Sequence, residues 1–187
     1  MEVPSPIHRA EKISNLFIAV IEKLVTEKAL ESGESEHITA SQLQALRFLS
    51  GYEAPLMGEV AHGLRISLPA ATKAIDRLVK KSLVGREEDP SDRRVVRIRL
   101  TQKGRELVNK VTDQRTSRLE HIMDAMSSED KAHLVRGMEG FVRSAIVDES
   151  IITELCLHCG EDHSDDCLIK DELMRLRGAE PILQTGA

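Results

Sequence analysis

Apolar residues recur at steps of three and four through the first 28 residues of the chain. The series starts near Ile7, ends near Lys28 and includes Ile13, Leu16, Phe17, Val20, Ile21, Leu24 and Val25. This spacing gathers the apolar side chains on one face of an α-helix. We therefore expect a long amphipathic helix that presents one continuous apolar face.

A second helical pattern follows a polar connection that contains glycine. Either Thr39 or Ser41 can cap the start of this helix with its hydroxyl oxygen. The apolar positions of the helix are Leu43, Leu46 and Leu49. Gly51 and Pro55 are expected to end it.

The next two helical segments are short and lie close together. The first runs from Leu56 to Leu64, and the second begins at Ser67, with Pro69 in its first turn, where a missing N–H costs nothing. The tight connection 63–66 joins them. This arrangement is predicted to be a helix–turn–helix.

After Gly85 the apolar period changes from 3.6 to 2. Apolar Val96, Ile98 and Leu100 alternate with Val95, Arg97 and Arg99, as in a half-buried strand. The charged stretch 86–95 is rich in turn formers and is expected to be the tip of a hairpin. The hairpin is therefore interpreted as a wing, in which Arg97 and Arg99 either contact phosphate or pair with Glu87 or Glu88.

Two long helices complete this pattern. Thr101 is expected to cap the first, and Ser127 with Asp130 resembles a capping box before the second. The predicted fold is mainly α with a small β wing. We expect a helical dimerisation region at 1–35 and 101–150, a winged helix–turn–helix at 36–100, and an appendage at 151–187 that contains cysteine, histidine and a short helix.

Charge is distributed unevenly along the chain. The net charge is −5, but residues 65–105 contain twelve Lys and Arg against five Asp and Glu, a local charge of +7 that leaves −12 for the rest. One basic segment in an acidic chain is the charge pattern of an oriented DNA-binding protein. Because aromatic residues make up only 2% of the chain, a base-stacking platform is excluded.

Other protein classes find little support in the sequence. The chain contains no apolar run of about 18 residues and no signal-peptide pattern, so we expect a cytoplasmic protein without membrane contact. It also lacks a nucleophile elbow, a phosphate-binding loop and an HExxH motif. An enzyme is therefore not expected.

The wing sequence from Glu88 to Gly104 resembles the wing signature of the MarR family of transcriptional regulators, and the stretch from Leu56 to Val84 is similar to the helix–turn–helix of that family. The resemblance implies an intertwined helical homodimer whose two winged helices bind double-stranded DNA across a pseudo-palindromic site. The long apolar faces of the first and last helices agree with a dimer, because a small winged-helix unit cannot bury them alone.

The second helix of a helix–turn–helix presents its first turns to the major groove. The candidate contacts in this helix are Ser67, Leu68, Pro69, Ala70, Thr72, Lys73 and Arg77. In the wing, the resemblance implies that Asp92 orients the guanidinium of Arg94 for the minor groove, where narrow A·T-rich sequence attracts arginine. Arg93 is a further candidate contact with phosphate or groove.

All three cysteines of the chain lie within twelve residues of the appendage, and Cys-x-x-Cys-Gly there resembles a zinc knuckle. Cys156, Cys159 and Cys167 with His163, or with His158 as the alternative, would form a Cys₃His zinc site. An iron–sulfur cluster, a pair of redox-active thiols, and an acidic tail without a site are the rival interpretations. A short helix through Leu168, Leu173 and Met174 is expected after the last cysteine.

The leading hypothesis is a dimeric, sequence-specific DNA-binding transcriptional regulator, in the role of a repressor. A small molecule, a metal or an oxidant would control its DNA affinity, the last two through the cysteine cluster. The alternative is a winged-helix scaffold whose zinc-knuckle tail recruits a protein partner.

Overall fold

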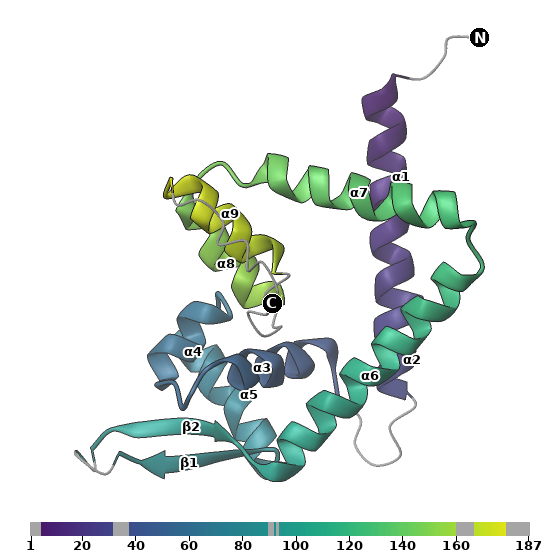
Figure 1. Cartoon of the computed structure of the whole chain (residues 1–187). Coiled ribbons are helices and arrows are strands. Elements are labelled where there is room, and N and C mark those ends of the chain that lie inside the picture. The colour runs from purple at the N-terminus through teal and green to yellow at the C-terminus, as the bar shows by residue number, and fades with distance from the viewer. Residues whose placement is uncertain (1–4, 32–37, 90–91, 93, 160–166, 179–187) are drawn as a thin grey trace, which may run out of the picture.

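The computed structural model describes residues 5–31, 38–89, 92, 94–159 and 167–178 of the 187-residue chain (Figure 1). The described part is mostly helical and contains one two-stranded antiparallel sheet, which confirms the predicted fold class. None of its helices is long and apolar enough to cross a membrane. The elements in chain order are α1 (Pro6–Val20), η1 (Ile21–Glu27), α2 (Lys28–Glu31), α3 (Ala40–Gly51), α4 (Met57–Gly63), α5 (Leu68–Lys80), β1 (Val84–Glu88), β2 (Val96–Leu100), α6 (Gln102–Asp124), α7 (Ser128–Ala145), α8 (Glu149–Cys159) and α9 (Leu168–Leu176).

The expected first helix is present, but it changes type along its length. It runs as α1, passes through the π-helical η1 and ends as α2, forming one rod beside α6 (Figure 1). Val25 in η1 is buried where η1 packs on α6. A three-and-four spacing of apolar residues does not reveal the wider π turn, which is commonly found at functional sites.

Side-chain caps define where the helices begin. Thr39, rather than Ser41, caps α3 and forms a capping box with Gln42. Thr101 and Ser127 cap α6 and α7 as predicted, and Ser67 caps α5, each by accepting the backbone N–H three residues on. These caps satisfy backbone N–H groups that have no partner within the helix.

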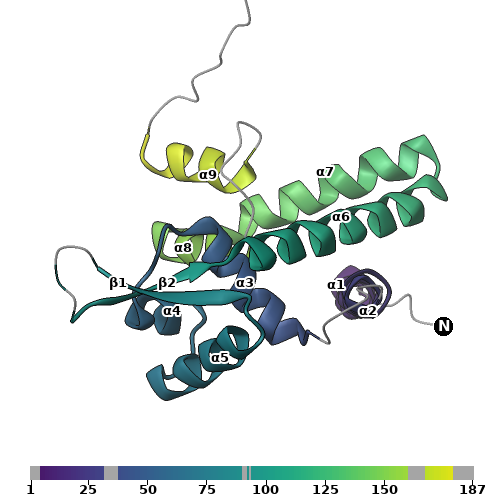
Figure 2. The same cartoon turned by 90° about the horizontal axis from the view of Figure 1, so that it is seen from below.

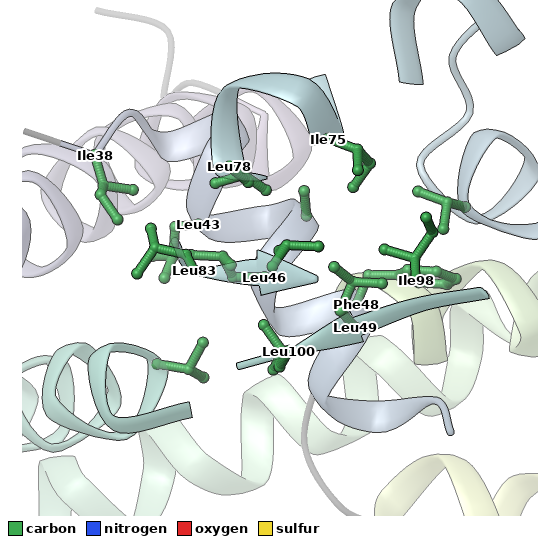
Figure 3. Close-up of a cluster of buried hydrophobic side chains, with 14 of the residues drawn as sticks. Ile38, Leu43, Leu46, Phe48, Leu49, Ile75, Leu78, Leu83, Ile98 and Leu100 are labelled. Atoms are coloured by element: carbon green, nitrogen blue, oxygen red, sulfur yellow. The ribbon is translucent and has the colours of Figure 1, made fainter. Parts of the chain in front are cut away.

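One apolar cluster joins the helix–turn–helix, the base of the wing and the start of α6 (Figure 3). Its fully buried members include Leu46 of α3, Ile75 and Leu78 of α5, Leu83, and Ile98 of β2. Because α3, α5 and β2 share these contacts, the recognition helix and the wing are held in a fixed relation to each other.

The appendage differs from its prediction. Two helices, α8 and α9, pack against each other, whereas one was expected. The Cys-x-x-Cys-Gly stretch was predicted to be a knuckle turn, but Cys156 and Cys159 lie in the last turn of α8. Asp148 starts this helix by accepting the N–H groups of Ser150 and Ile151 (2.8 and 3.4 Å). The Ser150 hydroxyl also donates to Asp148, and this bond, followed by the two backbone bonds, lowers the pKa of Asp148.

Gly104 marks the closest approach of α6 to the winged helix. The N–H of Thr101 donates to the carbonyl of Leu83 (3.1 Å) just before α6 begins. A Cβ at position 104 would lie 2.1 Å from that carbonyl oxygen. The start of α6 therefore requires glycine.

Gly104→Ala should lower the free energy of unfolding by about 1–3 kcal/mol, because α6 must move away from the Leu83 carbonyl. Gly58→Ala is the matched control, since Gly58 is exposed in α4 and a Cβ added there would have nothing within 4 Å. Thermal unfolding should show a clear drop for the first variant and little change for the control. Equal melting temperatures would contradict the close packing of α6 on Leu83.

Candidate DNA-binding surface

The recognition helix α5 has one buried and one open face. Ala71, Ile75 and Leu78 are buried in the core. The predicted contact residues on its open face or at its start are Ser67, Leu68, Pro69, Ala70, Lys73 and Arg77, all of which are exposed. The helix therefore presents polar, cationic and small apolar groups together, as a major-groove reader does.

Thr72 is more restricted than the other candidates in α5. It is half-buried, and its hydroxyl donates to the carbonyl of Leu68 (2.9 Å). This internal bond leaves the hydroxyl oxygen able to accept a hydrogen bond, so Thr72 can recognise a donor on DNA but not an acceptor.

In the turn before α5, the residue with the left-handed backbone conformation is not glycine. Arg65, not Gly63, adopts the left-handed conformation, with φ of 53°. Gly63 instead allows α3 to approach, because a Cβ there would lie 2.3 Å from Cε2 of Phe48. The turn leaves Ile66 and Leu68 exposed, and both apolar side chains can meet a thymine methyl group.

The wing is an antiparallel pair in which Val84 lies opposite Leu100 and Glu88 opposite Val96. At its tip, Asp92 accepts the backbone N–H of Arg94 (3.0 Å) and lies 3.6 Å from its Nε. The Arg94 side chain is 94% exposed. The structure thus brings Asp92 and Arg94 together as the sequence predicts, and it leaves the guanidinium open to DNA. Arg93 lies outside the described residues.

The base of the wing is anchored by Arg97. This side chain pairs with Asp89 and donates to the carbonyl of Ala54 (3.2 Å). The prediction that Arg97 pairs with Glu87 or Glu88 was wrong, because the hairpin places Asp89 within reach of Arg97. Arg99 does pair with Glu87 (2.7 Å). Both arginines are engaged within the protein.

An ion pair also ties the wing to the recognition helix. Arg86 of β1 pairs with Asp76 on the flank of α5. This contact was not predicted from the sequence, since the two residues are ten positions apart in different elements. It uses one arginine of the basic segment to position α5, while Lys73, Arg77 and Arg94 remain exposed.

Two of the candidate metal ligands, Cys156 and Cys167, have described side chains. Cys156 is half-buried in α8, and Cys167 immediately precedes α9. His163 and the side chains of Cys159 and His158 lie outside the described residues. Among the side chains that the structure describes, no group of three or more potential metal ligands is assembled.

The region predicted to form the dimer carries large exposed apolar side chains. In α1, Leu16 is 67% exposed, and in α7 Phe141 is 75% exposed. Further exposed members are Ile7, Ile13, Ile18, Val20, Leu24, Val135, Met138 and Val147. A single chain thus leaves two apolar helix faces uncovered (Figure 2 shows α1 standing clear of α7).

The chain is similar to a known protein family and to known transcriptional regulators. The MarR family model matches residues 38–96. The chain is 30% identical over 112 residues to YsmB of Bacillus subtilis, an uncharacterized HTH-type transcriptional regulator, with 60% of this chain and 77% of YsmB covered. It is 34% identical over 86 residues to the HTH-type transcriptional repressor MdtR of the same organism, covering 46% of this chain and 55% of MdtR.

The fold also resembles solved structures. FabT of Streptococcus pneumoniae, whose structure was solved in complex with DNA, matches with a TM-score of 0.61 and 21% identity. The match covers 75% of this chain and 97% of FabT, so a quarter of this chain has no counterpart there.

Arg94→Ala should weaken binding to duplex DNA and reduce the slope of log K against log salt by about 0.9, the value for one phosphate-equivalent contact. Lys131→Gln is the charge-matched control, because Lys131 lies at the corner between α6 and α7, far from the wing (Figure 1). Anisotropy titrations at several salt concentrations measure both quantities. A slope unchanged in Arg94→Ala would contradict the wing assignment.

Proposed function

The chain belongs to the MarR family of winged-helix DNA-binding transcriptional regulators, and from this membership we propose that it is a homodimeric repressor of a pseudo-palindromic operator. The observation that carries the proposal is the pairing of an exposed α5 face with an outward-facing Arg94 at the wing tip. Together these groups can read a major groove and the adjacent minor groove.

The uncovered apolar faces of α1 and α7 support the homodimer. Exposed apolar patches of this kind mark interaction surfaces in soluble proteins. A second copy offers the same faces, so a two-fold dimer buries both. Two recognition helices related by that axis would meet two half-sites about one helical turn apart.

The repressor role is supported by the names of related proteins. MdtR is named a transcriptional repressor, and FabT is a structural neighbour solved with DNA. The relatives are named as transcriptional regulators, which favours regulation over both enzymatic activity and the scaffold with a recruiting tail.

Control through the cysteine cluster is part of the proposal. The start of α8 pairs with the end of α9 through Glu149 and Arg177, so the cysteine-bearing end of α8 lies beside the start of α9. Cys156 and Cys159 are both in the last turn of α8, three residues apart in the chain. With Cys167 and His163 (or His158) they supply the thiolate and imidazole ligands that zinc prefers.

A small organic effector has a candidate location as well. A pocket of about 660 Å³ lies between the end of α3, β2 and α6, where the winged helix meets the dimerisation region. Tyr52, Arg99, Arg105 and Asp113 line it with Leu49 and Val108. Such a position would let a ligand bias the spacing of the two recognition helices.

The operator test uses the pseudo-palindrome from the promoter of its own gene. We expect one dimer per palindrome in a mobility-shift titration, and at least about a tenfold loss of affinity when one half-site is scrambled. Leu16→Asp should give monomers in analytical ultracentrifugation and lose operator binding, because it places a charge in the shared apolar face. Glu11→Gln on the same helix is the control. Full operator affinity of a monomeric variant would refute the dimeric mechanism.

The zinc test uses elemental analysis of protein purified without chelator. We expect one zinc per chain, lost in Cys167→Ser and retained in Asp171→Asn, a nearby change of similar size. Iron in place of zinc would support a cluster, and metal-free protein with oxidised thiols would support a redox switch. Either of these last results would refute zinc.

A further inference from the structure

The α8–α9 hairpin touches two parts of the molecule that differ in function. α8 packs on α3 of the helix–turn–helix unit, and α9 packs on α7, as Figure 1 shows. Ile146, at the end of α7, and Ile152, in α8, are buried. The hairpin therefore connects the DNA-binding unit with a helix that carries an uncovered apolar face.

The link to α7 is an ion-pair cluster around Glu172. This α9 side chain is 1% exposed and accepts hydrogen bonds from Arg143 of α7 and from Arg175. Burial alone would raise the pKa of Glu172, but the two guanidinium groups outweigh it and hold the pKa below its ordinary value. Asp171 adds a second carboxylate 3.8 Å from Arg143. A buried carboxylate depends strongly on such partners, so Arg143 fixes α9 on α7.

The link to the helix–turn–helix passes through aromatic rings. The ring of Tyr52, just after α3, stacks on Phe48 with centroids 4.6 Å apart. Phe48 in turn lies against Gly63, the last residue of α4 before the turn into α5. On the hairpin side, Tyr52 has Cys156 as an electrostatic neighbour: burial first, and then Cys156, raises the pKa of Tyr52. Contacts thus run from Tyr52 through Phe48 to the end of α4, and α8 packs on the same helix α3 that carries Phe48.

We propose that the α8–α9 hairpin is a strut that fixes the orientation of the helix–turn–helix relative to α7. Its effect on DNA rests on the proposed operator binding, because the strut would hold the two recognition helices at the operator spacing.

Hydrogen exchange of the intact dimer tests the strut without DNA. Arg143→Gln removes the contact between α7 and the hairpin, and should accelerate amide exchange in residues 48–66 by about tenfold or more. Arg177→Gln is the matched control: it also removes a guanidinium bound to a glutamate, but within the hairpin, and should affect only the ends of α8 and α9. Exchange in residues 48–66 that is unchanged in Arg143→Gln would overturn the strut.

A second pair of variants tests the side of the strut that faces the helix–turn–helix, at Tyr52. Tyr52→Ala should reproduce the faster exchange of residues 57–66, whereas Tyr52→Phe, which keeps the ring, should behave as wild type. Exchange in residues 57–66 that is unchanged in Tyr52→Ala would contradict a strut that acts through the ring of Tyr52.

Operators with one or two base pairs inserted between the half-sites measure the consequence for DNA. Wild type should discriminate against them, and Arg143→Gln should lose at least about fivefold of that discrimination, while Arg177→Gln should not. If wild type binds no operator but Arg143→Gln still accelerates exchange in residues 48–66, the strut is supported and the proposed function fails. If it binds operators normally and Arg143→Gln keeps the full discrimination, the strut fails and the proposed function stands.

Discussion

The burial of one face of α5 is the interaction on which the rest of the structure depends. Ile75 and Leu78 enter the same apolar cluster as Leu46, Leu83 and Ile98, so the recognition helix, α3 and the wing strand are held by one core. Because this face is buried, the opposite face of α5 is free to present Lys73 and Arg77 to DNA. The same cluster extends to Val108 and Val111 of α6, which connects the DNA-reading surface to the helix that the proposal places in the dimerisation region.

Electrostatic contacts divide the basic segment into two groups. Arg86, Arg97 and Arg99 are engaged by Asp76, Asp89 and Glu87, and they shape the wing and set its position on α5. Arg94 remains almost fully exposed beside Asp92. A local charge of +7 in the sequence therefore overstates the number of cations available for phosphate, but it identifies correctly the part of the chain that carries them.

Local signals account for what could be predicted from the sequence. The helix start at Ser67 and the caps at Thr101 and Ser127 act over a few residues, and the structure contains them. In β2 the alternation holds for Ile98, Arg99 and Leu100, whereas Val96 is exposed. Contacts between distant residues were not predictable in this way: Glu172 and Arg143 are 29 positions apart, and only the folded hairpin brings them together. The helix α8 was missed because the Cys-x-x-Cys-Gly motif suggested a turn, whereas the Asp148 cap favours a helix.

The central claim is that two copies of one surface, α5 with the wing tip, bind DNA in adjacent grooves. Hydroxyl-radical footprinting of the operator measures this most directly. We predict two protected blocks related by two-fold symmetry, with centres about one helical turn apart, each flanked by minor-groove protection that disappears in Arg94→Ala. A single asymmetric block, or flanking protection that persists in Arg94→Ala, would contradict it.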